Sequence, residues 1–324
     1  MSASKRHVLF LTTGDPKRMM SSRGNEMPNE SLQRAGARTE ARAWYDANLT
    51  MSTLAHFDTI SLLLCDKYNY YLSDFARFLK AVLIPLQEQH PHIHVFNDPE
   101  IILWNMDKIY LAELQDAGFS MPKTRFMDLS QHDLQTLESV VQGLPAARPV
   151  ILKPSVGASG RLCHRINAPQ SLTREDRECL QDFLDAQDIG SLMIQDFEMG
   201  IARGEYSLLY IHGTFTHAVL KVPAQGEYRI NSAFGGRYEE VLWSDVPLPA
   251  RETGQRLVDF LTSKFAKGDA NAMKRRMEYL RVDGVMREDG SFALIEAELI
   301  EPFLFLQFNK DMKGITAYCQ AYME

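Results

Sequence analysis

The stretch from residue 280 to residue 302 reads LRVDGVMREDGSFALIEAELIEP, and it decides how the rest of the chain is interpreted. Two apolar-rich runs, 280–286 and 292–299, flank the pair Asp289-Gly290. Asp-Gly between two such runs is a strong hairpin signal, because both residues tolerate the positive φ of a tight turn. The pattern therefore predicts two antiparallel strands joined by a short turn.

Three carboxylates lie on this predicted hairpin. Side chains alternate along a strand, so Glu296 and Glu298 point to the same face, and closure of the hairpin brings Asp283 beside them. Carboxylates that face one point repel one another unless a cation lies between them, and hard oxygen ligands favour Mg²⁺. The residues alone leave two interpretations open: a magnesium site, or a solvated acidic strand face.

Two upstream lysines favour the magnesium interpretation. Lys153 ends the apolar run 149–153 (PVILK) and is fixed by Pro154, so its ammonium group is placed to meet a phosphate; Lys108 lies at the start of a helical segment. The loop SVGASG, residues 155–160, offers backbone N–H groups to phosphate oxygens. It is not a Walker A loop, because no Gly-Lys-Ser/Thr follows. Each signal alone also fits a surface lysine or a flexible hairpin tip.

Apolar runs and helical spacing divide the first hundred residues into alternating strands and helices, which predicts a parallel sheet covered on both faces. The expected strands are 7–13, 37–45, 57–65 and 94–97, and the expected helices are 30–35 and 74–89. A helix is expected at 105–117. Residues 119–195 predict a small α+β module with one charged helix at 172–187. Strands are then expected at 206–211, 215–222, 280–286 and 292–299, interrupted by a helix at 250–265 and a loop at 266–271.

Bulk composition excludes several classes of protein. The 324 residues are 45% hydrophobic and 24% charged, which is ordinary globular composition, and the net charge of −7 comes without a basic stripe for nucleic acid. The four cysteines match no zinc spacing, and a disulfide framework is not expected in a chain of this length. No apolar run is long enough for a signal peptide or a membrane span. The expectation is a cytoplasmic protein that binds no nucleic acid and no membrane.

Five motifs follow one another in a characteristic order: WNMDKIYL, PVILKPSVGASG, LMIQDFEMGIARGEYSLLYI, HAVLKVPAQGEYRINSAFGG, and RVDGVM with IEAELIEP. This order resembles the ATP-grasp superfamily, on the branch of glutathione synthetase and the ribosomal-protein glutamate ligase. GEYSLLYI, THAVLKVP and ELIEP are most similar to cyclo-ligases that make D-cycloserine from O-ureido-serine. The resemblance spans residues 95–310. It implies an α/β and α+β fold: an N-terminal pre-ATP-grasp α/β domain (1–100), a linker helix and central lid module (101–195), and a C-terminal catalytic domain (196–324).

The resemblance also implies roles for individual residues. Those that would bind ATP are Lys108, Lys153, Gly157, Ser159, the adenine hinge Gln195, Asp196, Phe197 and Glu198, and Glu205 at the ribose. Lys221, Arg229 and Asn231 would be catalytic and would neutralise the transferred phosphate and the acyl phosphate. Asp283, Glu296 and Glu298 would bind one or two Mg²⁺ ions, with Mn²⁺ as an alternative ion. The glutathione-synthetase branch usually has Asn where this chain has Glu298.

The implied activity is an ADP-forming carboxylate–amine ligase that makes an amide or peptide bond through an acyl phosphate, within one small molecule or between two. Alternatives are a ligase with a protein acceptor, a kinase that stops after phosphoryl transfer, and a nucleotide-binding regulator without catalysis. Homodimers are common in the families that the chain resembles. His90, His92 and His94 could share a strand face, but Pro91 disturbs it, so a surface turn is expected there.

Overall fold

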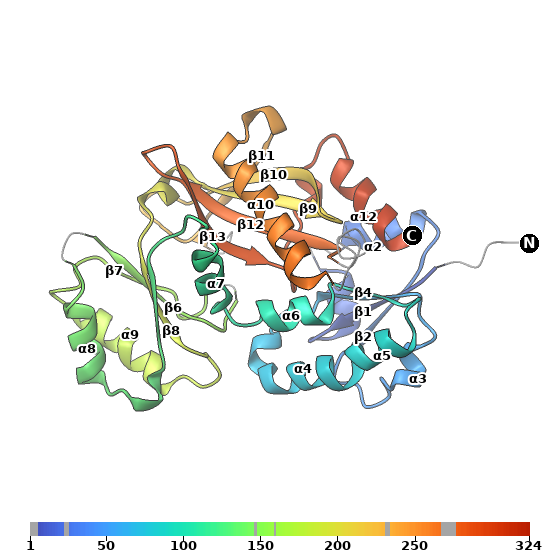
Figure 1. Cartoon of the computed structure of the whole chain (residues 1–324), viewed down its shortest axis with the longest axis horizontal. Coiled ribbons are helices and arrows are strands. Elements are labelled where there is room, and N and C mark those ends of the chain that lie inside the picture. The colour runs from blue at the N-terminus through green and yellow to red at the C-terminus, as the bar shows by residue number, and fades with distance from the viewer. Residues whose placement is uncertain (1–5, 23–25, 146–147, 159, 231–233, 267–276) are drawn as a thin grey trace, which may run out of the picture.

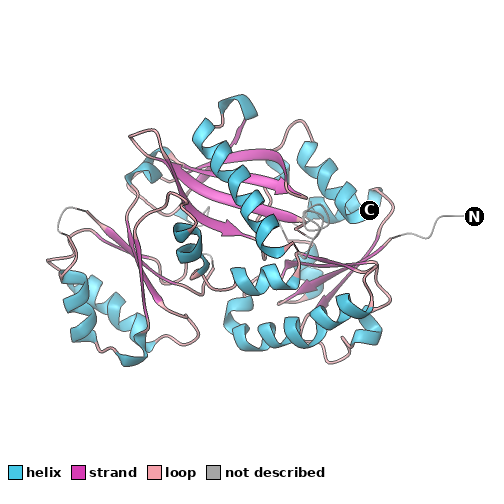
Figure 2. Cartoon of the chain, in the orientation of Figure 1, coloured by secondary structure: helices cyan, strands magenta, loops and turns pink. Residues whose placement is uncertain are grey.

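The computed structural model describes residues 6–22, 26–145, 148–158, 160–230, 234–266 and 277–324. Figure 1 shows three sheets, each with helices packed on it, and Figure 2 shows the helices and strands in the same orientation. The sheets occupy residues 7–96, 124–196 and 205–298. The predicted loop at 266–271 falls almost wholly outside the described residues.

The N-terminal sheet has the strand order β2-β1-β3-β4, and every pair in it is parallel, as predicted. Its strands are β1 (His7–Thr12), β2 (Arg38–Ala43), β3 (Thr59–Leu64) and β4 (His94–Phe96). Its helical segments are α1 (Pro16–Met20), α2 (Glu26–Arg34), α3 (Met51–Leu54), η1 (Tyr68–Tyr71), α4 (Leu72–Phe78), the π turn η2 (Leu79–Leu83) and α5 (Ile84–Gln89).

Alternation along β1 explains why both faces of this sheet are covered. Leu9 and Leu11 join one buried cluster with residues of α4, η2 and α5, while Val8 and Phe10 join another with α2 and the C-terminal helix α12 (Lys313–Met323). A strand that is apolar on both sides is typical of a parallel sheet between two helical layers. The prediction had no helix at 313–323, and the structure adds it to the core of the N-terminal sheet.

A linker of two helices joins this sheet to the next, where one was predicted. Asp98 caps α6 (Pro99–Asn105) by accepting a hydrogen bond from the Glu100 N–H at 2.9 Å, and Pro99 occupies the first turn. The second helix is α7 (Tyr110–Asp116). The single helix expected at 105–117 is therefore wrong in its start: residues 106–109 separate two helices, and Lys108 lies in that break.

The second sheet belongs to the small module at one end of the molecule and has the order β5-β8-β6-β7 (Figure 1). Its elements are β5 (Thr124–Met127), η3 (Leu129–Gln131), α8 (Leu134–Gln142), β6 (Val150–Pro154), β7 (His164–Ile166), α9 (Arg174–Asp185) and β8 (Leu192–Asp196). A capping box between Thr173 and Asp176 begins α9. The prediction of a single helix in this module was wrong, because α8 packs beside α9 around Leu137 and Leu180.

The third sheet is antiparallel and carries the hairpin predicted from 280–302. Its order is β11-β10-β9-β12-β13, with β9 (Glu205–Ile211), β10 (Thr214–Val222), β11 (Arg237–Val241), β12 (Tyr279–Met286) and β13 (Phe292–Glu298). The helical segments of this region are η4 (Met199–Arg203), η6 (Trp243–Asp245), α10 (Leu248–Phe265) and η7 (Leu306–Phe308). Gly290 takes φ 81° in the β12–β13 turn, which confirms the Asp-Gly turn signal.

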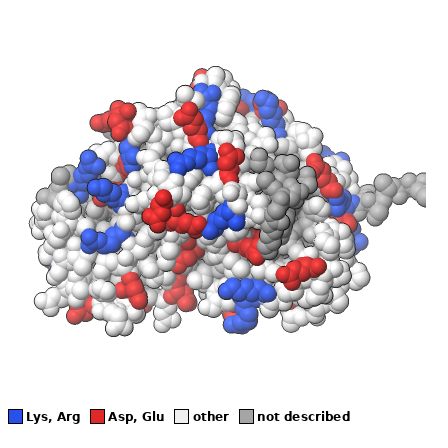
Figure 3. All heavy atoms as spheres, viewed as in Figure 1, with Lys and Arg blue, Asp and Glu red and all other residues white. Residues whose placement is uncertain are grey.

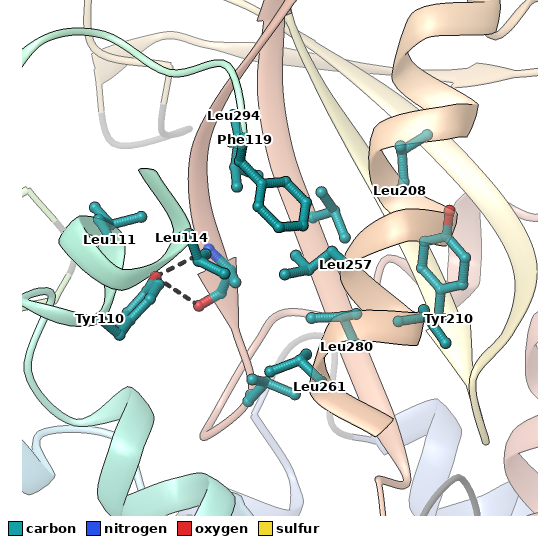
Figure 4. Close-up of a cluster of buried hydrophobic side chains, with 14 of the residues drawn as sticks. Tyr110, Leu111, Leu114, Phe119, Leu208, Tyr210, Leu257, Leu261, Leu280 and Leu294 are labelled. Carbon is teal, nitrogen blue, oxygen red and sulfur yellow. Dashed lines mark hydrogen bonds between the residues drawn. The ribbon is translucent and has the colours of Figure 1, made fainter. Parts of the chain in front are cut away.

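One face of this sheet packs against α7 and α10. Figure 4 shows Leu257 and Leu261 of α10 beside Leu208 and Leu280 of the sheet. Leu114 of α7 belongs to the same cluster. All five side chains are fully buried. The opposite face carries buried apolar residues, among them Leu209, Val219 and Tyr279, that join the cluster shared with the N-terminal sheet, and it also carries the polar residues of the cavity wall.

The described residues contain no helix that is long and apolar enough to cross a membrane. All four cysteines are free thiols. On the face in Figure 3, acidic and basic side chains are interspersed, and no continuous basic tract is visible.

Candidate active site

A cavity of about 550 Å³ lies where the three sheets meet, and residues from all three regions line it. Thirteen of the fifteen predicted site residues lie along its wall: Lys108, Lys153, Gly157, Gln195, Asp196, Phe197, Glu198, Glu205, Lys221, Arg229, Asp283, Glu296 and Glu298. Ser159 and Asn231 fall outside the described residues. Residues 175 positions apart in the sequence, Lys108 and Asp283, thus border one space.

The hairpin places its carboxylates as the alternation predicted. Asp283 lies opposite Glu296 in the β12–β13 register, and Arg281 lies opposite Glu298. Opposed residues in an antiparallel pair project from the same face. Ser207 of β9 is opposite Asp283 on the other side and donates a hydrogen bond to it at 2.6 Å.

Arg281 is the residue that the sequence analysis missed. Its guanidinium group binds Asp283 through Nη2 at 2.9 Å, makes a very short contact with Glu298, and donates from Nη1 to the Phe303 carbonyl at 3.1 Å. A signal was available, because Arg281 and Asp283 are two residues apart on one strand and must share a face. Although burial opposes ionisation, Arg281 and Lys221 hold the pKa of Asp283 well below its usual range.

Lys221 forms a second buried ion-pair cluster on the same face. Its ammonium group lies 2.5 Å from Glu205 and 3.1 Å from Asp283. Burial disfavours its charge, but Asp283 and Glu205 outweigh this effect and raise the pKa of Lys221. Burial raises the pKa of Glu205 in turn. Glu205 is thus paired with Lys221, whereas the resemblance implies that Glu205 contacts the ribose of ATP.

Lys108 and Lys153 enter the cavity from opposite sides of the β6–β7 loop. Lys108 donates to the Gly157 carbonyl at 2.7 Å and pairs with Glu296 at 3.2 Å, so it joins the small module to the hairpin. Burial lowers the pKa of Lys153, and Glu296 opposes that effect. The described residues contain no ion pair to Lys153, which leaves its ammonium group available to an anion in the cavity.

The predicted adenine hinge begins in the last two residues of β8 and continues to Glu198. The Gln195 side chain donates to Thr124 at 2.8 Å, and the Phe197 ring lies under the Arg165 guanidinium at 5.1 Å. Glu198 binds Arg287 through a forked contact with distances from 2.6 to 3.2 Å. These contacts fix the strand end, so its backbone lies along the cavity wall.

Arg229 lies at the edge of the cavity but is already paired. It binds Glu227 of its own loop at 2.7 and 3.1 Å and lies 3.8 Å from the Phe234 ring centroid. The Glu227 carboxylate raises the pKa of Arg229. A catalytic role for Arg229 would require this pair to open.

The chemistry of the hairpin carboxylates fits a divalent ion. Asp283, Glu296 and Glu298 supply hard oxygen ligands from neighbouring positions on one sheet face. Within the described ranges, no group of three or more acidic, histidine or cysteine side chains converges on one point. The oxygens instead contact Arg281, Lys221 and Lys108, so a metal ion would take the place of these cations as the counter-charge.

Comparisons with known proteins agree with this architecture. The family model of the ATP-grasp domain of prokaryotic glutathione synthetase matches residues 108–258. The cycloserine biosynthesis protein DcsG of Streptomyces lavendulae is 24% identical over 239 residues, which cover 69% of this chain and 71% of that protein.

Solved structures extend the likeness to the whole chain. The crystal structure of the D-cycloserine synthetase DcsG has a TM-score of 0.70 at 19% identity and covers 98% of this chain and 99% of that one. The D-alanine–D-alanine ligase of Bacillus anthracis complexed with ATP has a TM-score of 0.62 at 14% identity, with coverage of 98% and 97%. The ATP-grasp ligase PsnB with its minimal precursor has a TM-score of 0.59 at 16% identity, with coverage of 98% and 99%. The motifs, the family model over residues 108–258 and the fold agree with one another, and together they support an ATP-grasp ligase similar to DcsG.

Proposed function

We propose that this ligase joins a carboxylate to an amine through an acyl phosphate and releases ADP and inorganic phosphate. The observation that carries the proposal is the arrangement inside the cavity. Lys153 lies on β6 of the small module and Lys108 lies in the linker, and both line the cavity with Asp283, Glu296 and Glu298 of the hairpin. A nucleotide phosphate chain needs cations on one side and metal-binding carboxylates on the other.

The first half of the reaction moves the γ-phosphoryl group onto a substrate carboxylate. Asp283, Glu296 and Glu298 are the residues that would hold Mg²⁺, which neutralises phosphate charge and fixes the phosphate oxygens when it is bound. Lys153, which has no ion pair among the described residues, would bind a phosphate oxygen. The backbone of Asp196 and Phe197 would meet the adenine. Catalysis here is mainly positioning and charge stabilisation.

The second half is attack of an amine on the acyl carbon. The nitrogen forms the new C–N bond, the C–O bond to phosphate breaks, and the amine loses one proton. Lys221 and Arg281 lie on the sheet face beside the carboxylates, where they would neutralise the oxyanion and the departing phosphate. The small module would exclude water, since Lys108 already links its Gly157 to Glu296.

The likeness to DcsG, a cycloserine biosynthesis protein, supports a small-molecule substrate and an intramolecular ligation. A cytoplasmic location is supported by the four free thiols. The homodimer and the domain divisions at residues 100 and 195 remain predictions.

The test is product analysis with single amino acids and pairs of amino acids, in the presence of ATP and Mg²⁺. We expect one ADP and one phosphate for each amide, and hydroxylamine should trap the activated acyl group as a hydroxamate. A requirement for two amino acids would indicate intermolecular ligation. AMP and pyrophosphate as the stoichiometric products would refute the acyl phosphate, and ADP without free phosphate would identify a kinase.

A further inference from the structure

The carboxylate Glu301 lines the same cavity but belongs to none of the groups described above. Four other carboxylates on this side of the cavity, Glu205, Asp283, Glu296 and Glu298, each have a basic group within 4 Å. Glu301 has no hydrogen bond and no ion pair of that length to any of the residues that the structure describes. It is therefore a carboxyl group at the cavity wall whose partner is not supplied by the residues that the structure describes.

The backbone around Glu301 is firmly held. The Tyr279 hydroxyl donates to the Ile300 carbonyl at 2.9 Å, and Arg281 donates to the Phe303 carbonyl at 3.1 Å. Asn97 also donates to the Leu299 carbonyl at 2.8 Å. Hydrogen bonds on both sides of residue 301 therefore hold its backbone at the cavity wall.

The neighbours of Glu301 make this end of the cavity acidic. Burial, followed by the charge of Glu298, raises the pKa of Glu301 to about 8, and Asp66 adds to that rise. Asp66 follows β3 at the carboxyl edge of the parallel sheet, which is where such sheets bind ligands. Tyr68 lines the cavity from the same segment. A cation bound beside this half-buried group would lower its pKa and restore the charge of the carboxylate, so a cationic ligand is the chemistry that suits this position.

We infer that Glu301 receives the amino group of the nucleophile and holds it beside the acyl phosphate. The inference rests on the proposed function and adds a residue to it. Glu301 lies three residues beyond Glu298, in the segment that follows β13, and it lines the same cavity. It accepts hydrogen bonds from the substrate N–H groups. Its substrate class is a primary amine, such as the amino group of an amino acid, that is positively charged when it enters.

The variant Glu301→Gln tests this inference, because the amide keeps the shape of the side chain and removes its charge. With the amino acid or pair that gives the most ADP with wild-type protein, kcat/KM for the amine should fall about 10- to 100-fold, as expected when a hydrogen bond to a charged group is lost. Acyl phosphate formation should persist, so hydroxamate yield with hydroxylamine should stay near the wild-type value while amide formed per ADP falls. Glu301→Asp should recover part of the coupling.

Glu288→Gln is the matched control, since its side chain is 86% exposed in the β12–β13 turn, and it should behave like wild type. An unchanged ratio of amide to ADP in Glu301→Gln would overturn the inference while leaving the proposed function intact. A shift in the Mg²⁺ requirement with normal coupling would also overturn it, by making Glu301 a metal ligand. Wild-type protein without amine-dependent amide formation would overturn the proposed function and the inference together.

Discussion

Replacing Tyr110 by phenylalanine should destabilise the protein by about 2 kcal/mol. The hydroxyl of this buried residue accepts a hydrogen bond from the Ala297 N–H at 3.0 Å and donates to the Ala297 carbonyl at 2.9 Å, as Figure 4 shows. Ala297 is in β13, the edge strand that carries Glu296 and Glu298. Among the strands that the structure describes, none pairs with the outer side of β13, so Tyr110 supplies hydrogen bonds that a neighbouring strand would otherwise make.

The magnitude follows from what each backbone group retains. In Tyr110→Phe the Ala297 carbonyl keeps its hydrogen bond from Asn105 at 2.8 Å, but the Ala297 N–H is left with no acceptor. One orphaned buried donor costs about 1–3 kcal/mol, and the lost second bond to the carbonyl adds a fraction of that. Phenylalanine fills the same space, so no cavity term is expected.

Urea unfolding followed by tryptophan fluorescence and by circular dichroism measures the effect, provided that the two transitions coincide. The amide of Ala297 should also exchange its hydrogen faster in the variant. Tyr45→Phe is the control, because the Tyr45 hydroxyl donates to Thr13 from a residue that is 57% exposed, and less than about 0.5 kcal/mol is expected there. A Tyr110→Phe variant as stable as Tyr45→Phe would refute the reasoning.

Three other predictions follow from the site and the core. Glu296→Gln and Glu298→Gln should each lower turnover by more than about tenfold and raise the Mg²⁺ requirement, because each removes a charge from the proposed metal site; ADP release across a Mg²⁺ titration checks this, and wild-type behaviour of both variants at limiting Mg²⁺ would count against it. Lys153→Met should weaken ATP binding in calorimetry, and an unchanged affinity in a folded variant would remove Lys153 from the site. Burial lowers the pKa of His217 to about 4, so its neutral form stabilises the fold above about pH 6.5. That contribution, about 3 kcal/mol, should be lost as the pH falls through 4; His217→Gln should show a shallower loss of stability between pH 6.5 and 4, and identical slopes for both proteins would contradict the assignment.

Most of the strands could be predicted from the sequence, because a buried strand requires a run or an alternation of apolar residues that is visible locally. The runs 7–13 and 57–65 are rich in apolar residues, and each contains a strand that is buried on both faces. The hairpin at 280–302 carried its own turn signal. The helix at residues 99–105 also had signals, Asp98 and Pro99, that were not used.

What the sequence could not reveal were contacts between distant segments. Asn105 and Tyr110 show helical spacing and nothing more, yet they cap the edge of a strand almost two hundred residues away. These contacts depend on how the three sheets meet, and that is a property of the whole fold. Arg229 instead pairs with Glu227, two residues earlier on the same loop, a local partner that the sequence analysis did not consider.

The buried ion pairs around Arg281 and Lys221 have a consequence for how mutational data should be interpreted. Each charge in this network is compensated by a neighbour, so neutralising one member leaves another buried charge without a partner. The measured loss of stability or activity in such a variant combines two terms: the energy of the lost interaction, and the cost of leaving the other charge buried and unpaired. A double-mutant cycle, for example across Lys221 and Glu205, separates the two quantities. Binding of nucleotide and metal would then amount to an exchange of counter-ions among groups that are already desolvated, which keeps the reorganisation of the site small.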